Sequence, residues 1–188
     1  MPTWNADQYL KFGDERTQPC RDLALRVSIP ALRTVVDLGC GPGNSTKVIA
    51  ERWPQAEITG VDNSAAMIET ARRDHPQFRW VVSDITSWAS EGGPQFDIVF
   101  SNAALHWVPE HAALYLKIFG RVVHGGAFAV QAPSNLDSPA QRLMREITPR
   151  GLLVNEWFTH PPGFYYDLLA PLAAHLDLWQ TEYLIVGY

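Results

Sequence analysis

Short apolar runs alternate with amphipathic stretches from residue 34 to residue 131. Five runs are predicted strands: 34–38, 58–61, 78–82, 96–101 and 127–131. Three stretches between them have the apolar spacing of helices: 45–52, 64–73 and 110–119. Strands that alternate with helices build βαβ units, so the pattern predicts an α/β fold with a doubly wound, mostly parallel sheet.

The two ends of the chain are less regular. Residues 5–29 have helical spacing, with a break that we expect at Pro19 because proline lacks the backbone N–H. Further expected elements are a turn at 124–126, helices at 141–147 and 165–174, and a strand at 176–184.

Composition restricts the class of protein. With 188 residues, of which 46% are hydrophobic and 19% charged, the chain suits one globular domain. The formal net charge of −5 argues against nonspecific nucleic-acid binding, which needs a basic surface. The sequence contains no bilayer-length apolar run and no signal-peptide pattern, so we expect a cytoplasmic protein without a membrane partner.

Disulfide and metal chemistry find no support in the sequence. Cys20 and Cys40 form neither a disulfide framework nor a metal-ligand spacing. The six histidines are scattered along the chain, so we expect no metal.

The segment 35–44 carries the most specific chemistry. It is predicted as a buried strand that enters a glycine turn, in which Asp37 precedes Gly39, Gly41 and Gly43. Glycine permits backbone angles and close approaches that a Cβ would block, so such a turn can lie flat against a ligand.

Asp62 ends the next predicted strand. A strand, a glycine turn, a helix, a strand and an acid, in that order, build a nucleotide site in α/β sheets, where the carboxylate accepts hydrogen bonds from the ribose hydroxyls. The G-x-G-x-G spacing disfavours a NAD-dependent oxidoreductase, whose fingerprint is G-x-G-x-x-G. The alternative is a tight turn followed by an ordinary acidic residue.

With these motifs the chain resembles the trans-aconitate 2-methyltransferases, a family of class I S-adenosyl-L-methionine (SAM) methyltransferases. The resemblance rests on six runs: WNADQYLKFGDERTQP at 4–19, DLGCGPGNST at 37–46, GVDNSAAMI at 60–68, FDIVFSNAALHW at 96–107, LMRE at 143–146 and YYDLL at 165–169. Related carboxyl methyltransferases, including the malonyl-carrier-protein type, share much of the first half. The resemblance implies a single SAM-dependent methyltransferase domain over residues 1–188, with a Rossmann-like seven-stranded sheet and a helical cap formed by 5–29 and 138–175.

Members of this family are longer and close their sheet with an antiparallel hairpin of two final strands. Here 178–183 resembles the first of these strands and 184–188 the second, with no residues between them for a turn. We therefore expect segments of the family pattern to be omitted near 147–155 and 183–185, or the chain to be truly shorter. Either way, part of a substrate lid would be missing from this sequence.

The resemblance implies a set of cofactor-binding residues, most of them at the ends of predicted strands: Arg16, Asp37, Gly39, Gly41, Asp62, Asn63, Met67, Asp84, Ile85 and Asn102. Gly39 and Gly41 would line the methionine portion of SAM, and Asp37 would hold the loop or a water at the amino group. Asp62 would bind the ribose diol, and Met67 or Asn63 would pack on the adenine. Asn102 would lie near the methionine amino group.

Three of these assignments have competing interpretations. Asp84 would accept from the adenine amino group, beside the Ile85 N–H at a ring nitrogen, but it also suits a helix N-cap. Met67 also suits core packing. Arg16 would clamp the SAM carboxylate bidentately, or would be a solvated surface arginine.

On the acceptor side the resemblance implies six substrate-binding residues: Tyr9, His106, Trp107, Arg145, Tyr165 and Tyr166. His106 and Asn102 would act at the reacting groups. His106 has three possible roles: general base, hydrogen-bond donor to a substrate carboxylate, or buried structural histidine. A carboxylate acceptor is already ionised near neutral pH and needs no base, which favours an orienting role. Arg145 would supply positive charge to a polycarboxylate, or would be a solvated charge on a helix face.

The sequence thus predicts a SAM-dependent O-methyltransferase that acts on a carboxylate of a small acid. Trans-aconitate is the first candidate acceptor, and S-adenosyl-L-homocysteine is the expected product of the donor. The alternatives are another acceptor, such as a carrier-protein malonyl ester or a different small molecule, and a noncatalytic SAM-binding module. We expect a monomer or weak homodimer that acts on a small-molecule acid, with no nucleic acid and no membrane as partner.

Overall fold

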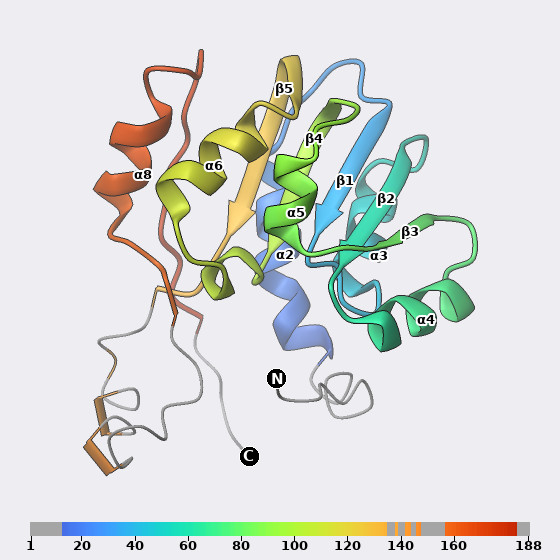
Figure 1. Ribbon diagram of the computed structural model, residues 1–188, viewed down its shortest axis with the longest axis horizontal. Coiled ribbons are helices and arrows are strands. Elements are labelled where there is room, and N and C mark those ends of the chain that lie inside the picture. The colour runs from blue at the N-terminus through green and yellow to red at the C-terminus, as the bar shows by residue number, and fades with distance from the viewer. Residues whose placement is uncertain (1–12, 135–137, 139–141, 144–145, 148–156, 184–188) are drawn as a thin grey trace.

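The computed structural model describes residues 13–134, 138, 142–143, 146–147 and 157–183. At its centre is a sheet of five parallel strands in the order β3-β2-β1-β4-β5 (Figure 1). The strands are β1 (Thr34–Leu38), β2 (Glu57–Asp62), β3 (Arg79–Val82), β4 (Phe96–Asn102) and β5 (Val122–Gln131). The strand order reverses between β1 and β4, and open α/β sheets bind ligands beside the carboxyl ends of the strands at such a point.

Helices cover both faces of this sheet, so the predicted doubly wound α/β fold is confirmed. The helical elements are α2 (Gly13–Arg26), α3 (Asn44–Arg52), α4 (Ala65–Asp74), α5 (Ile85–Ser90), the 3₁₀ turn η1 (Leu105–Trp107), α6 (His111–Phe119) and α8 (Pro162–Leu169). Helices α2 and α3 pack on one face, and α5, α6 and α8 pack on the other (Figure 1). Helix α4 packs on β2 and β3 through Ile68, Ala71 and Trp80.

Strand β1 shows how the sequence builds the two layers. Successive side chains of a strand point to opposite faces. Val36 and Leu38 pack in the core beneath α5 and α6, whereas Val35 packs with α2 and α3. Asp37 therefore points toward α3, where its carboxylate meets that helix's first residues.

Pro19 does not break the N-terminal helix, contrary to our expectation, because α2 runs through it. A proline inside a helix removes a backbone hydrogen bond and costs about 3 kcal/mol. Cys20, Leu23 and Ala24 of the same helix are each at most 3% exposed and pack against the sheet. Burial of a large apolar side chain such as Leu23 stabilises the fold by about 1–3 kcal/mol. This packing offsets the cost of the proline inside the helix.

The turn expected at 124–126 lies within β5 as an irregularity of the strand. Phe96 pairs with Val122 and Ile98 with Ala127, so a step of two residues along β4 matches five along β5. Gly125 has a φ of +80°, which favours glycine. The interruption was correctly located, but the strand begins at Val122 rather than at residue 127.

The strand expected at 176–184 is wrong for residues 176–183, which are in neither strand nor helix. Side chains bind this segment to α2 instead. Arg26 donates to Asp177 at 3.1 Å, and its guanidinium lies 4.1 Å from the centre of the Trp179 ring. Of the seven strands expected, the described residues form five, and 184–188 lie outside them.

The remaining helix predictions near the C-terminus are partly confirmed. Residues 142–143 and 146–147 are helical, while the rest of the predicted helix 141–147 lies outside the described residues. Helix α8 starts earlier than predicted and ends at Leu169, before Pro171. None of the helices in the described part of the chain is both long and apolar enough to span a membrane.

Candidate active site

The glycine turn after β1 is held in a conformation that only glycines adopt easily. Gly39, Gly41 and Gly43 have φ values of +75°, +55° and +103°. The N–H groups of Gly39 and Cys40 donate to the carbonyl of Val61 at 2.8 and 3.1 Å, which fixes the turn against the end of β2. The turn is therefore positioned by the sheet itself.

The two sides of this turn differ in the space around them. A Cβ on Gly39 would overlap the side chain of Ala104, so glycine is required there for packing. A Cβ on Gly41 would meet nothing within 4 Å. The Gly41 side is thus open and can receive a ligand against bare backbone.

Asp62 is fixed at the edge of this open side. Its Oδ2 accepts from the Gly41 N–H and its Oδ1 from the Ser64 N–H, both at 2.9 Å. A carboxylate has roughly four acceptor sites, so each oxygen retains a site for a further donor. The geometry suits a diol with two hydroxyl donors.

Asp37 lies beneath the turn and is fully buried. Its Oδ2 accepts from the hydroxyls of Ser45 and Thr46, both at 2.6 Å, so it holds the start of α3. Burial raises the pKa of this carboxyl to about 6, against the opposing effect of the two hydroxyl donors. Its Oδ1 is buried without a hydrogen-bond partner among the described residues.

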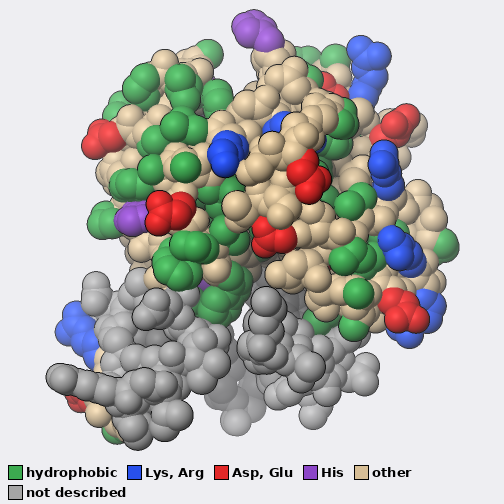
Figure 2. Space-filling model, in the orientation of Figure 1, with side chains coloured by type: hydrophobic (Ala, Val, Ile, Leu, Met, Phe, Trp, Pro, Cys, Tyr) green, Lys and Arg blue, Asp and Glu red, His purple; other side chains and the backbone are tan. Residues whose placement is uncertain are grey.

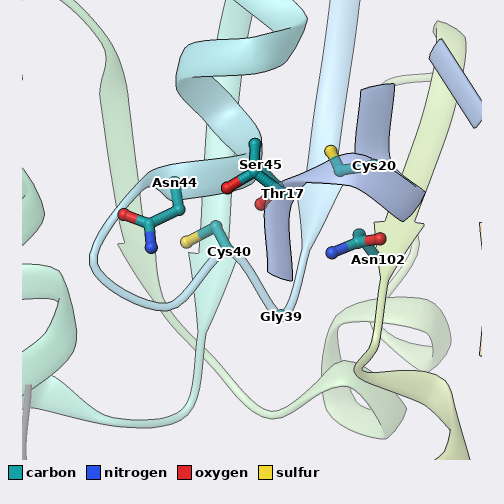
Figure 3. Close-up of a pocket in the computed structure, with 7 residues that line it drawn as sticks. All are labelled: Thr17, Cys20, Gly39, Cys40, Asn44, Ser45 and Asn102. Atoms are coloured by element: carbon teal, nitrogen blue, oxygen red, sulfur yellow. The ribbon is translucent and has the colours of Figure 1, made fainter. Parts of the chain in front are cut away.

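A small cavity of about 20 Å³ lies between α2, the glycine turn and the end of β4 (Figure 3). Its lining residues are Thr17, Cys20, Gly39, Cys40, Asn44, Ser45 and Asn102. This volume suits about one water molecule. Helix α2 therefore closes the inner side of the turn, and the open side remains at Gly41.

Four other predicted cofactor residues follow β2 and β3. Asn63 is exposed, and Met67 is 6% exposed on α4, in agreement with the core-packing alternative. Asp84 is the N-cap of α5 and accepts from the Ser87 N–H at 3.0 Å, so the capping alternative is confirmed. Ile85 is the first residue of α5, where N–H groups have no partner within the helix.

Asn102 and Gln131 end the neighbouring strands β4 and β5 and are partners in the ladder. The Oδ1 of Asn102 and the Oε1 of Gln131 are both buried without a partner among the described residues. Buried polar atoms are normally hydrogen-bonded, so these two side chains suit a polar ligand at the strand ends.

His106 lies on η1, just beyond β4, and is 3% exposed. Burial lowers the pKa of His106 to about 4, and the nearby His111 adds to the shift. Its ring packs against Trp107 and Trp157, with centroid distances of 4.6 and 5.2 Å. Its Nδ1 is buried without a partner among the described residues. His106 is therefore a neutral imidazole at pH 7. Its Nδ1 can donate or accept one hydrogen bond, depending on the tautomer.

The structure separates the two tyrosines predicted to bind substrate. The Tyr165 hydroxyl bonds to the Nδ1 of His111 at 2.7 Å and accepts from the His160 N–H at 3.0 Å. Tyr166 is 53% exposed on the solvent side of α8. Tyr9 and Arg145 lie outside the described residues, as does the side chain of Arg16.

Sequence reasoning missed three polar or aromatic residues beside this site. Gln131 could have been found because it ends a strand, as Asn102 does. Trp157 was not among the predicted site residues, and neither was Thr159, whose hydroxyl is buried without a partner among the described residues. The sequence of 149–162 has no local periodicity from which the positions of Trp157 and Thr159 could be predicted.

Charge on the visible face of the described residues is mixed. Acidic and basic side chains are interspersed on this face rather than gathered into one basic patch (Figure 2). The described residues also contain no group of three or more histidine, cysteine or acidic side chains placed to hold a metal. The described part of the site therefore provides neutral hydrogen-bonding groups and carboxylate acceptors.

Comparison with known proteins agrees with this geometry. Residues 35–126 match the family model described as a methyltransferase domain. A chain in the complex between the Haloferax volcanii Trm112 methyltransferase activator and a putative methyltransferase has a TM-score of 0.69 and 18% identity, covering 88% of this chain and 72% of that one. The plantazolicin methyltransferase BpumL in complex with SAH has a TM-score of 0.59 and 15% identity, covering 77% and 57%. The fold and the glycine turn define a class I methyltransferase with a Rossmann-like fold.

The sequence relatives narrow this class to one family. The trans-aconitate 2-methyltransferase of Azoarcus sp. (strain BH72) is 47% identical over 194 residues, which cover 97% of this chain and 74% of the relative. The chain belongs to the trans-aconitate 2-methyltransferase family.

Proposed function

We propose that this protein transfers the methyl group of SAM to a carboxylate oxygen of trans-aconitate. The observation that carries the proposal is the open Gly41 side of the turn, with the Asp62 carboxylate fixed at its edge. The names of the relatives supply the acceptor. The protein acts on this small-molecule acid in the cytoplasm, as a monomer or weak homodimer and without nucleic acid.

The residues of the turn fit SAM in chemistry as well as in space. Asp62 retains acceptor sites for the two ribose hydroxyls, and bare backbone at Gly39 and Gly41 accommodates the methionine portion. The partnerless Oδ1 of Asp37 and Oδ1 of Asn102 suit the positively charged amino group. Arg16, on α2, holds the SAM carboxylate.

Beyond β3, the same chain forms the adenine side of this site. Asp84 uses one oxygen to cap α5 and presents the other to the adenine amino group. The N–H of Ile85 meets a ring nitrogen, and of the two candidates for the adenine face the exposed Asn63 packs on the ring while Met67 packs in the core. The carboxyl ends of β1, β2 and β3 thus bind the nucleoside from three sides.

SAM supplies a methyl group on a positively charged sulfur, so the protein needs no nucleophile of its own. The acceptor carboxylate is ionised at neutral pH. Catalysis then depends on holding the carboxylate oxygen in line with the methyl carbon, with the reacting atoms ~3 Å apart. His106 and Asn102 orient that carboxylate through hydrogen bonds rather than by removing a proton.

The remaining carboxylates of the acceptor need positive charge, which a neutral His106 cannot provide. We assign this role to Arg145, and we assign further contacts with the acceptor to Tyr9 and Trp107. Of the cap expected from 5–29 and 138–175, the described helices α2 and α8 pack on opposite faces of the sheet. Tyr166 is left out of the acceptor site because its side chain faces solvent.

Methyl transfer from labelled SAM to a set of acceptors tests the proposal. The set contains trans-aconitate, cis-aconitate, citrate, isocitrate and a malonyl thioester, and mass spectrometry identifies the products. We expect a monomethyl ester of trans-aconitate, formed with the highest kcat/KM of the set. Preferential methylation of the malonyl thioester would support the carrier-protein alternative, and binding of SAM without transfer to any acceptor would support the noncatalytic one.

A further inference from the structure

The turn η1 carries His106. Two consecutive carbonyls of this turn accept hydrogen bonds from other parts of the chain. The N–H of Phe158 donates to the carbonyl of His106 at 2.9 Å. The Nε2 of His111 lies 3.0 Å from the carbonyl of Leu105. The first bond comes from the segment that precedes α8, and the second comes from the first residue of α6.

The second of these bonds continues to α8. A carbonyl only accepts, so Nε2 of His111 carries a proton and donates to Leu105. Burial lowers the pKa of His111, so the ring is neutral and its Nδ1 is an acceptor. The Tyr165 hydroxyl, 2.7 Å away, therefore donates to Nδ1, and it accepts in turn from the N–H of His160.

Aromatic packing holds this chain of hydrogen bonds in place. His111 is 1% exposed, and its ring centroid lies 5.1 Å from that of Tyr115 and 5.8 Å from that of Tyr165. Tyr115 and Tyr165 are themselves 5.0 Å apart. The Tyr165 hydroxyl is thus directed into the protein and already has a donor and an acceptor as partners.

We propose that Tyr165 and His111 are a positioning pair for His106, through the carbonyl of Leu105, and that Tyr165 is not a substrate contact. This inference rests on the proposed function, in which His106 orients the acceptor carboxylate. The pair fixes the height and orientation of η1 relative to α8. A displacement of η1 moves the imidazole of His106 away from the acceptor.

Tyr165→Phe removes the hydroxyl and keeps the ring packing, and Tyr166→Phe is the matched control on the same helix. We expect Tyr165→Phe to lower kcat about tenfold or more, because small displacements of orienting groups have effects of this size. The SAM dissociation constant should stay within about twofold of wild type, since the Tyr165 hydroxyl bonds to His111 and His160 and not to a proposed cofactor residue. Tyr166→Phe should leave both constants unchanged.

Substitutions of His111 give a second, independent comparison. His111→Leu removes the hydrogen bonds to Leu105 and Tyr165, whereas the amide of His111→Gln offers an NH2 donor and a carbonyl acceptor. We expect loss of kcat in the leucine variant and partial recovery in the glutamine variant. If Tyr165→Phe retains wild-type kcat, or if glutamine is no better than leucine, the positioning pair is refuted.

Hydrogen exchange tests the positioning pair independently of the proposed function, because the measurement uses the protein without a methyl acceptor. The Val108 N–H bonds to the same Leu105 carbonyl at 3.0 Å, so its exchange reports on η1. We expect faster exchange in Tyr165→Phe than in Tyr166→Phe. If wild type fails to methylate trans-aconitate but exchange quickens, the proposed function fails and the pair stands. If wild type is active and exchange is unchanged in Tyr165→Phe, the pair fails alone.

Discussion

Replacing Asp37 with asparagine should change how the stability of the ligand-free protein depends on pH. Burial raises the pKa of this carboxyl from 3.8 to about 6. A group with a raised pKa contributes stability that is fully present below its unfolded pKa and is lost as pH rises through the folded value. Wild type therefore loses stability from this group between about pH 4 and pH 6.

The size of this effect follows from the shift. A difference of about two pKa units corresponds to ~3 kcal/mol at neutral pH, as an upper figure. Integration of the linkage relation puts roughly half of this between pH 5 and pH 7.5. Asparagine can still accept from Ser45 and Thr46, and it removes the charge.

Urea unfolding at the two pH values measures the effect. We expect the stability of Asp37→Asn relative to wild type to be higher at pH 7.5 than at pH 5, by on the order of 1 kcal/mol. Comparing the two pH values cancels the effect of the amide's own hydrogen bonds. An equal difference at both values, or a larger one at pH 5, would refute the reasoning that the buried carboxyl resists ionisation.

Asp97→Asn is the control for this comparison. Partial burial acts to raise the pKa of Asp97, but hydrogen bonds from the backbone N–H groups of Arg33 and Thr34 outweigh it and hold the pKa below the usual range. Its titration thus ends below pH 5. The variant should lose stability to a similar extent at both pH values.

Three further substitutions or profiles test the site. Gly39→Ala should destabilise the fold by ~2–3 kcal/mol in urea unfolding, because it combines a positive φ with overlap behind the turn; stability near wild type would contradict this. Gly41→Ala should cost only ~1 kcal/mol but weaken SAM binding at least tenfold by calorimetry, since its Cβ projects into the open side. With the pKa of His106 at about 4 in the ligand-free protein, the profile of kcat/KM against pH should show no limb from this residue between about pH 6 and pH 8. A limb in that range that disappears in His106→Gln would show that the ring titrates there.

The sequence was sufficient for the parts of the fold that depend on local patterns. The strand 34–38, the glycine turn and the position of Asp62 at a strand end are set by neighbouring residues. Ser64 caps α4 by accepting from the Met67 N–H at 3.4 Å, a contact between residues only three positions apart. The first half of the site could therefore be predicted before the structure was known.

The rest depends on contacts between distant segments. Helix α2 continues through Pro19 because its next turns pack on the sheet, and no local rule gives that energy. The segment 176–183 lies against α2 through Arg26 rather than in the sheet. Two hydrogen-bond partners of Tyr165 are 54 residues away, at His111, and five residues away, at His160. The sequence indicated that this tyrosine matters but not which group it binds.

The central claim is that the Asp62 carboxylate holds the sugar of SAM at the Gly41 turn. Calorimetric titration of SAM into wild type, Asp62→Asn and Glu57→Gln tests it directly, because Glu57 is the exposed acidic residue at the opposite end of the same strand. The Asp62→Asn variant loses hydrogen bonds to a charged group, which contribute ~1.5–3 kcal/mol. It should therefore bind SAM at least tenfold more weakly than wild type, whereas Glu57→Gln should bind SAM with wild-type affinity. Equal SAM affinity in wild type and Asp62→Asn would contradict the account.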